Sequence, residues 1–186
     1  MLIIFFVLIF FVSGCFVNTM IPAPKRPFAS DELLANKEEL PIGWTIPWGP
    51  QRDTDTSKPQ GAMQVNLFKK PNSEKPDVTE RVAIYPSVEG AKIQFSEQAK
   101  FPENTDVQGW SYTSKIADEQ KFSCFTYSNL DYPICTWLAR YQEITIEIIG
   151  RLMPGRATID EMQVIVKIID NKVANHLTIF PTKSKN

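Results

Sequence analysis

The stretch Glu143–Ile149 reads E-I-T-I-E-I-I and decides the fold class, because apolar and polar residues alternate along it. Alternation with a period of two predicts a strand that buries one face. The buried face is expected to carry Ile144, Ile146 and Ile148. The other face, with Thr145 and Glu147, is expected to meet solvent.

The best candidates in this strand for a pair of catalytic carboxylates are Glu143 and Glu147. They lie on one face, but four residues at about 3.3 Å each separate them by some 13 Å. Paired glycosidase carboxylates stand about 5 to 9.5 Å apart. We therefore interpret both glutamates as part of a solvated face.

Two helices are expected to cover the sheet to which this strand belongs. Thr158 and Glu161 have the spacing of a capping box, and apolar residues then recur at helical intervals, which predicts a helix over 159–175. Ser87 is a suitable N-cap for a second helix over about 88–100, whose apolar residues form a single stripe.

The remaining pattern predicts a short helix over 30–40 and further strands at 41–48, 62–68, 78–84, 107–114, 121–127 and 134–138. Together these elements predict an α+β fold, with one mostly antiparallel sheet of about six to seven strands and two main helices. The whole stretch 30–180 is expected to be a single domain. Its element order loosely resembles the PsbP and Mog1 type of α/β/α sandwich, a fold that small exported and adaptor domains commonly adopt.

The composition argues against several functions. Twenty Lys and Arg against 21 Asp and Glu give a net charge of −1 without a basic run, so binding to nucleic acid is not expected. Neither G-x-G-x-x-G nor G-x-x-x-x-G-K occurs, so no nucleotide cofactor is expected. A serine hydrolase is not expected either, because G-x-S-x-G is absent.

The N-terminus predicts export. Residues 1–12 are uniformly apolar, and Val12-Ser13-Gly14-Cys15 follows with small residues before a cysteine. This tetrapeptide resembles the bacterial lipobox, which implies a signal peptide over 1–14 and a lipid on Cys15. The expected location is then the extracytoplasmic side of a cell membrane. A secretory signal cut after Gly14, giving a soluble protein, and an uncleaved membrane anchor are the alternatives.

The segment 15–29 contains three prolines and shows no helix or strand period, so it is interpreted as a tether between the lipid and the domain. At about 3 Å per residue it could hold the domain up to roughly 45 Å from the lipid. The tail 181–186 is expected to be disordered.

Three cysteines are present, and lipidation of Cys15 would leave Cys124 and Cys135 as an even pair. They fall on consecutive predicted strands joined by a short loop, so a hairpin would bring them to disulfide distance. A metal site is the alternative, but it would need more ligands than a chain with one histidine readily offers, and no metal is expected. That histidine, His176, falls near the end of the last helix.

Four other residues are candidates for binding a partner. Trp44 and Trp48 could form an exposed aromatic ledge for a glycan or an extended peptide, with core and edge packing as the alternative. Arg140 and Tyr141 are expected at the turn between the last two strands, where exposed residues can carry recognition.

Three functions remain open. The first is a non-enzymatic lipoprotein whose domain binds a partner protein or assists assembly at the membrane surface. The second is an extracytoplasmic domain that binds or senses a small ligand in a groove between helices and sheet. The third is an enzyme whose catalytic residues form no recognisable motif.

Overall fold

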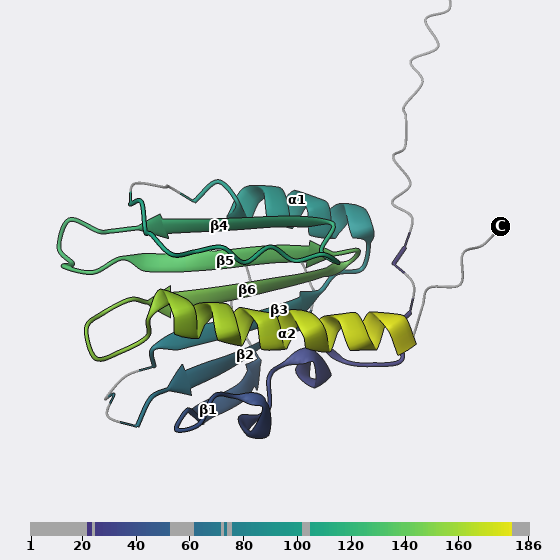
Figure 1. Cartoon of the computed structure of the whole chain (residues 1–186). Helices are drawn as coiled ribbons and strands as arrows, with labels where there is room; N and C mark the ends of the chain where they lie inside the picture. Colours follow the sequence, from purple (N-terminus) through teal and green to yellow (C-terminus); the bar gives the residue numbers. More distant parts are fainter. Residues whose placement is uncertain are drawn as a thin grey trace, which may run out of the picture.

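The computed structural model describes residues 22–23, 25–52, 62–71, 73, 76–101 and 105–179. Within them, six strands form one antiparallel sheet in the order β1-β2-β3-β6-β5-β4 (Figure 1). The strands are β1 (Thr45–Arg52), β2 (Ala62–Lys69), β3 (Val78–Ile84), β4 (Glu119–Phe125), β5 (Ile134–Tyr141) and β6 (Ile144–Arg151). The main helices are α1 (Val88–Gln98) and α2 (Ile159–Ile179). The predicted α+β class is confirmed.

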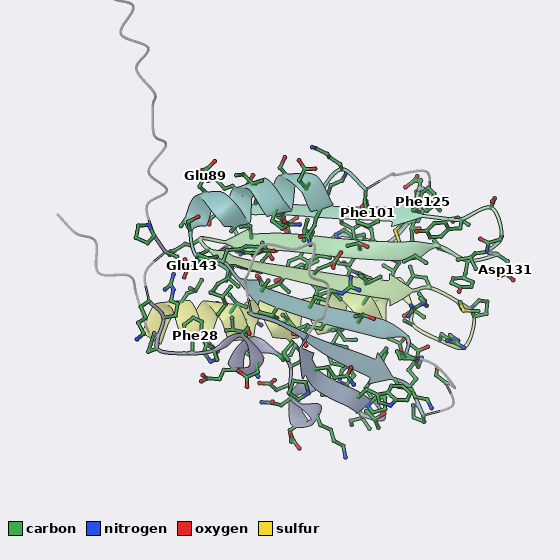
Figure 2. The ribbon with its side chains drawn as sticks, turned by 180° about the vertical axis from the view of Figure 1, so that it is seen from behind. Phe28, Glu89, Phe101, Phe125, Asp131 and Glu143 are labelled. Atoms are coloured by element: carbon green, nitrogen blue, oxygen red, sulfur yellow. A yellow bond between two sulfur atoms is a disulfide. The ribbon has the colours of Figure 1, made fainter. Side chains whose placement is uncertain are left out.

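One main helix covers each face of the sheet. α2 runs along the face that carries the isoleucines of β6, and Figure 1 shows it in front of the strands. α1 lies on the opposite face, where its Ala91 joins Ala83 and Tyr85 in a small apolar cluster. Figure 2 views the molecule from behind and shows α1 in front. The result is three layers, helix on sheet on helix.

The main core lies between α2 and the sheet. Ile144, Ile146 and Ile148 of β6 are fully buried there, as predicted. They meet the apolar stripe of α2, which consists of Met162, Ile165, Val166, Ile169 and Val173. Because these residues recur at helical spacing, one side of α2 can stay in contact with the sheet along most of its length.

The predicted capping box starts α2. The backbone N–H of Glu161 donates to Oγ1 of Thr158 over 3.3 Å, and Oε2 of Glu161 accepts from the backbone N–H of Thr158 over 2.9 Å. The helix continues past the predicted end at residue 175, because Leu177 still packs against the core. Its last turn therefore adds to the buried surface.

The prediction that Glu143 and Glu147 are solvated is wrong. Glu143 is 0% exposed and Glu147 6% exposed. Glu147 lies on the face that α1 partly covers, and its Oε2 accepts a hydrogen bond from Arg81 over 2.8 Å. Glu143 is paired with Arg26. A buried carboxylate needs such a partner, and both partners are far away in the sequence.

Two predicted elements take another form. The predicted strand 107–114 is an extended segment outside the sheet, and the short helix predicted over 30–40 is two 3₁₀ turns, η1 (Ser30–Leu33) and η2 (Lys37–Glu39). In each turn a glutamate side chain folds back onto the residue before the turn: Glu32 accepts from the backbone N–H of Ala29, and Glu39 accepts from that of Asn36. These local bonds close single turns instead of one continuous helix.

The folded domain begins before the predicted boundary at residue 30. Phe28 is 7% exposed and belongs to the main core, and the side chain of Arg26 is 4% exposed. Residues 25–29 are therefore part of the domain rather than of a tether. The predicted signal peptide, Cys15 and the tail 181–186 lie outside the described residues.

In the described part of the chain, no helix is both long and apolar enough to cross a bilayer.

Candidate functional site

The predicted disulfide is present. Cys124 on β4 and Cys135 on β5 are direct register partners, with Cα atoms 4.0 Å apart, and their sulfurs are bonded. The bond lies on the α2 side of the sheet, because Cys135 shares its face with Trp137 and Tyr141 of the core. It fastens the edge strand β4 to its neighbour.

Trp44 and Trp48 do not form a ledge together. Trp44 is 4% exposed and belongs to the main core, whereas Trp48 on the edge strand β1 is 44% exposed. Gly43 has a positive φ of 90°, and the turn there directs the chain from η2 into β1. The prediction of a shared aromatic surface is therefore wrong for Trp44.

Arg140 and Tyr141 are not at an exposed turn. Both are buried in the last two positions of β5, and the turn consists of Gln142 and Glu143. Arg140 is held between two carboxylates, with Nη1 3.0 Å from Oδ2 of Asp118 and Nε 2.5 Å from Oε2 of Glu119. These ion pairs hold the first residue of β4, and the residue before it, against the end of β5.

Tyr141 takes part in a cluster centred on the buried Asp170 of α2. The carboxylate of Asp170 accepts hydrogen bonds from the hydroxyls of Tyr141, Tyr112 and Ser114, the last two over 2.5 Å and 2.8 Å. Burial, together with the bond to Asp170, raises the pKa of Tyr112 and of Tyr141. Three hydroxyl donors thus replace water around a buried carboxylate.

This Asp170 cluster joins α2, β5 and the segment 110–114, and we interpret it as structural. Asp170 is 4% exposed, and the three hydroxyls occupy both of its carboxylate oxygens.

His176 lies in the last turns of α2, as predicted. Its Nδ1 is 2.9 Å from the carbonyl oxygen of Lys172, and its ring meets the ring of Phe28 edge to face, with centroids 5.4 Å apart. These contacts account for its position.

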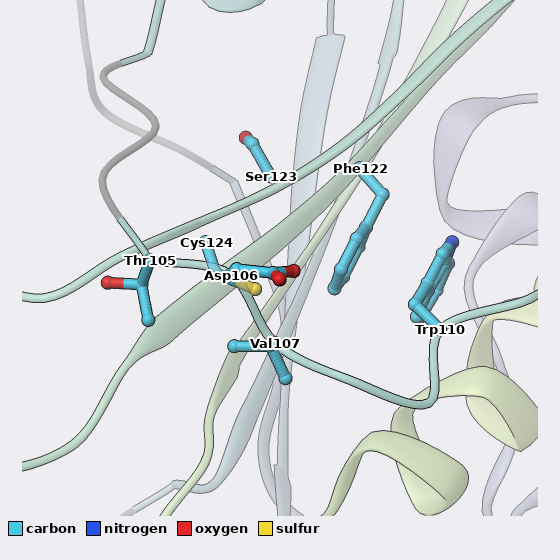
Figure 3. Close-up of a pocket in the computed structure, with 7 residues that line it drawn as sticks. All are labelled: Thr105, Asp106, Val107, Trp110, Phe122, Ser123 and Cys124. Carbon is cyan, nitrogen blue, oxygen red and sulfur yellow. The ribbon is translucent and has the colours of Figure 1, made fainter.

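A groove that the sequence did not predict lies between β4 and the segment 105–113. Trp110, from this segment, stacks on Phe122 of β4 with parallel rings and centroids 3.9 Å apart. A hollow of about 500 Å³ lies on one side of the stack, and Figure 3 shows the residues that line it: Thr105, Asp106, Val107, Trp110, Phe122, Ser123 and Cys124. A second hollow of about 340 Å³ is lined by Trp110–Thr113, Gln120, Phe122 and Trp137. We call the two hollows with the stack the Trp110 groove.

The Trp110 groove runs beside an edge of the sheet. β4 is the last strand in the strand order and pairs only with β5 among the described strands. On its outer side, the carbonyl oxygen of Cys124 accepts a hydrogen bond from the backbone N–H of Thr105 over 3.3 Å. The outer backbone of β4 is thus already used by one extended segment, at one end of the groove.

The groove combines aromatic and polar groups. Trp110 and Phe122 supply flat apolar surface, while Thr105, Asp106 and Ser123 supply hydroxyl and carboxylate groups. Gly109, with a positive φ of 96°, allows the turn that brings Trp110 onto Phe122. A glycine inside a predicted strand was the one signal in the sequence that the segment could leave the sheet.

Among the residues that the structure describes, no group of three or more His, Cys, Asp or Glu side chains is placed to hold a metal ion.

No protein-family model, curated protein or solved structure matches the chain.

Proposed function

We propose that this chain is an exported, non-enzymatic lipoprotein, anchored through a lipid on Cys15, whose domain binds an extended segment of a partner protein. The observation that carries the binding role is the Trp110 groove, where a stacked Trp110–Phe122 pair stands beside the edge strand β4.

Two physical properties of the groove favour an extended peptide. An edge strand presents backbone N–H and C=O groups along its outer side, and a peptide can add to it as a further strand. Aromatic side chains beside such an edge offer large contact area with little loss of conformational entropy, and tryptophan is among the residues that contribute most to binding energy. Asp106, which is exposed, could select for a basic residue in the partner.

The anchor and the location are supported by the cysteines. Val12-Ser13-Gly14-Cys15 resembles a lipobox, and Cys124–Cys135 is a bond of the kind that persists in oxidising compartments. With Cys124 and Cys135 bonded, Cys15 is the one cysteine left for lipidation.

A small ligand is the second candidate for the same groove. The larger hollow, at about 500 Å³, lies within the range of small-molecule sites, and its lining mixes apolar and polar groups as such sites do. In this case the domain would act as an extracytoplasmic sensor or carrier rather than as a partner for a protein.

Site-directed photocrosslinking in the cells that make the protein separates the two candidates. A photoreactive amino acid replaces Asp106 in the groove, and the control places it at Lys167, which is exposed on α2. We expect one protein to be crosslinked from position 106 but not from 167, with the link mapped to a continuous segment. No protein crosslinked at 106, or equal crosslinking at both positions, would contradict the peptide-binding proposal.

The anchor is tested separately by intact-mass analysis of the membrane fraction. We expect a chain that begins at Cys15 and carries lipid mass on that residue. An unmodified chain released into the medium would contradict the anchor, and membrane association that survives Cys15→Ala would point to an uncleaved signal segment.

A further inference from the structure

The segment that leads into the domain is held by a buried ion pair. Arg26 donates from Nε to Oε1 of Glu143 over 2.5 Å and from Nη2 to Oε2 over 3.2 Å, and Nη2 also donates to Oε1 of Gln142 over 2.6 Å. The two charged side chains are 4% and 0% exposed. Arg26 thus grips the turn between β5 and β6, which lies 117 residues further along the chain.

Residues on both sides of Arg26 also contact the domain. Before it, the backbone N–H of Ala23 donates to the carbonyl oxygen of Pro86, just ahead of α1, over 2.6 Å. After it, Phe28 is buried in the main core and meets His176 of α2. We call Pro22, Ala23 and residues 25–28 the N-terminal clamp, because contacts from this set reach the β5–β6 turn, Pro86 ahead of α1 and His176 near the end of α2.

Breaking the central pair would leave a charge buried without a partner, which is strongly unfavourable. The chain is therefore expected to stay fixed up to about Pro22 rather than to become free at residue 29. Only residues 16–21 then remain between Cys15 and the clamp. A fully extended chain spans at most about 3.6 Å per residue, so Pro22 can stand no further than about 25 Å from Cys15.

The clamp and the β4–β5 loop lie toward opposite ends of the domain. Figure 2 shows Glu143 and Phe28 at one end, with Glu89 of α1 near them. Phe125, the last residue of β4, and Asp131 of the loop are labelled toward the other end. The Trp110 groove runs along β4 between these ends, from Gln120 to Cys124. A short connection to the clamp thus brings one particular end of the domain near the anchor.

We propose that the N-terminal clamp fixes the orientation of the domain on a lipid bilayer, with the β5–β6 turn facing the bilayer and the β4–β5 loop facing away from it. The inference rests on the proposed lipid at Cys15. It gives the clamp a function, since a free tether of residues 16–29 would let the domain rotate, so that either end could meet the lipid surface.

Energy transfer to the bilayer tests this orientation. The mature lipidated chain is reconstituted in vesicles of phosphatidylethanolamine and phosphatidylglycerol that carry an acceptor dye on the headgroups. A donor dye is attached through a clickable amino acid at either Glu89 or Asp131, both of which are exposed. We expect higher transfer from position 89 than from position 131. Equal transfer, or higher transfer from 131, would overturn the proposal.

The variant Arg26→Ala tests the role of the clamp in the same assay. Its matched control is Arg81→Ala, which removes the ion pair with Glu147 on the α1 side of the sheet and leaves the clamp intact. Melting curves establish that each variant is folded at the assay temperature. If Arg26→Ala is not folded, Glu143→Gln, which keeps the shape of the side chain, replaces it as the clamp variant. We expect the clamp variant to lose the difference between positions 89 and 131 and the control to keep it. A clamp variant that keeps the full difference would overturn the proposal.

A further arm separates this inference from the proposed anchor. The chain is prepared without cellular lipidation, and Cys15 is coupled to a synthetic lipid through a thioether. If cells leave Cys15 unmodified but the coupled chain shows the difference between positions 89 and 131, the anchor proposal fails and the clamp's orienting geometry stands. If cells lipidate Cys15 but both preparations give equal transfer, the orientation fails alone.

Discussion

The hydroxyl of Tyr141 on β5 donates a hydrogen bond to the carboxylate of Asp170 on α2, across the main core. Tyr112 and Ser114 donate to the same carboxylate from the segment that leads to β4. One acidic side chain thus connects the long helix, the sheet and the segment that carries Trp110. Removal of the Asp170 carboxylate should weaken the packing between these three elements.

Asp170→Asn is expected to destabilise the domain by about 1 to 3 kcal/mol, because the amide group cannot accept all the hydrogen bonds that the carboxylate accepts. Asp160→Asn is the matched control, since Asp160 is exposed at the start of α2. Denaturant unfolding of both variants measures the effect. Equal free energies of unfolding for Asp170→Asn and wild type would contradict the structural role of the cluster.

Alkaline pH should weaken the fold through Tyr112 and Tyr141. Their pKa values are raised in the folded state from the ordinary value of 10.0, so the folded protein keeps their protons where the unfolded chain releases them. This stabilisation is complete below about pH 10 and is lost as the pH rises through the raised values. Tyr112→Phe should therefore reduce the slope of unfolding free energy against pH above 10. An unchanged slope would mean that the folded-state shift is absent.

The Cys124–Cys135 bond should stabilise the domain by about 3 kcal/mol in the chain-entropy model for a loop of this size. Denaturant unfolding compares three forms: the oxidised wild type, the reduced wild type and the double variant Cys124→Ser/Cys135→Ser. We expect the oxidised wild type to be the most stable of the three forms. Free thiols at both positions in the exported protein, found by non-reducing peptide mapping, would be evidence against the bond.

Trp44 and Trp48 should behave differently despite their proximity in sequence. Trp44→Ala removes a buried ring and is expected to cost about 3 to 5 kcal/mol. Trp48→Ala changes a ring that is 44% exposed on an edge strand and should cost clearly less. Thermal melts measure the loss of stability in each variant. Similar losses for the two variants would contradict the buried position of Trp44 and the exposed position of Trp48.

Much of the fold could be predicted from the sequence, because it depends on local periodicity. β3 begins at the predicted residue, Val78, and α2 begins at the predicted capping box. The burial of Glu143 could not be predicted in this way, because its partner Arg26 lies in a proline-rich segment with no periodic pattern. The turn before β6 consists of Gln142 and Glu143, later in the chain than predicted. Arg140 and Tyr141 therefore lie in β5 and not at an exposed turn.

The Trp110 groove also could not be predicted from the local sequence pattern. Residues 107–114 have the aromatic and β-branched composition of a strand, yet they form no strand, and the neighbouring Thr105 donates a backbone hydrogen bond to the outer edge of β4. Composition indicates that a segment is extended, but not whether it joins a sheet or crosses beside one. The stack of Trp110 on Phe122 is a tertiary contact, and it is this contact that creates the groove.

Peptide binding in the Trp110 groove is tested most directly by the affinity of the oxidised mature domain for the partner segment crosslinked at position 106, prepared as a synthetic peptide. We expect Trp110→Ala to weaken binding about tenfold or more, as for a tryptophan that dominates an interface, with Trp48→Ala as the unaffected control. Asp106→Lys, which alters an exposed residue of the groove without touching the core, should also weaken binding. Equal affinities for wild type, Trp110→Ala and Asp106→Lys, with all three folded, would show that the peptide does not bind in this groove.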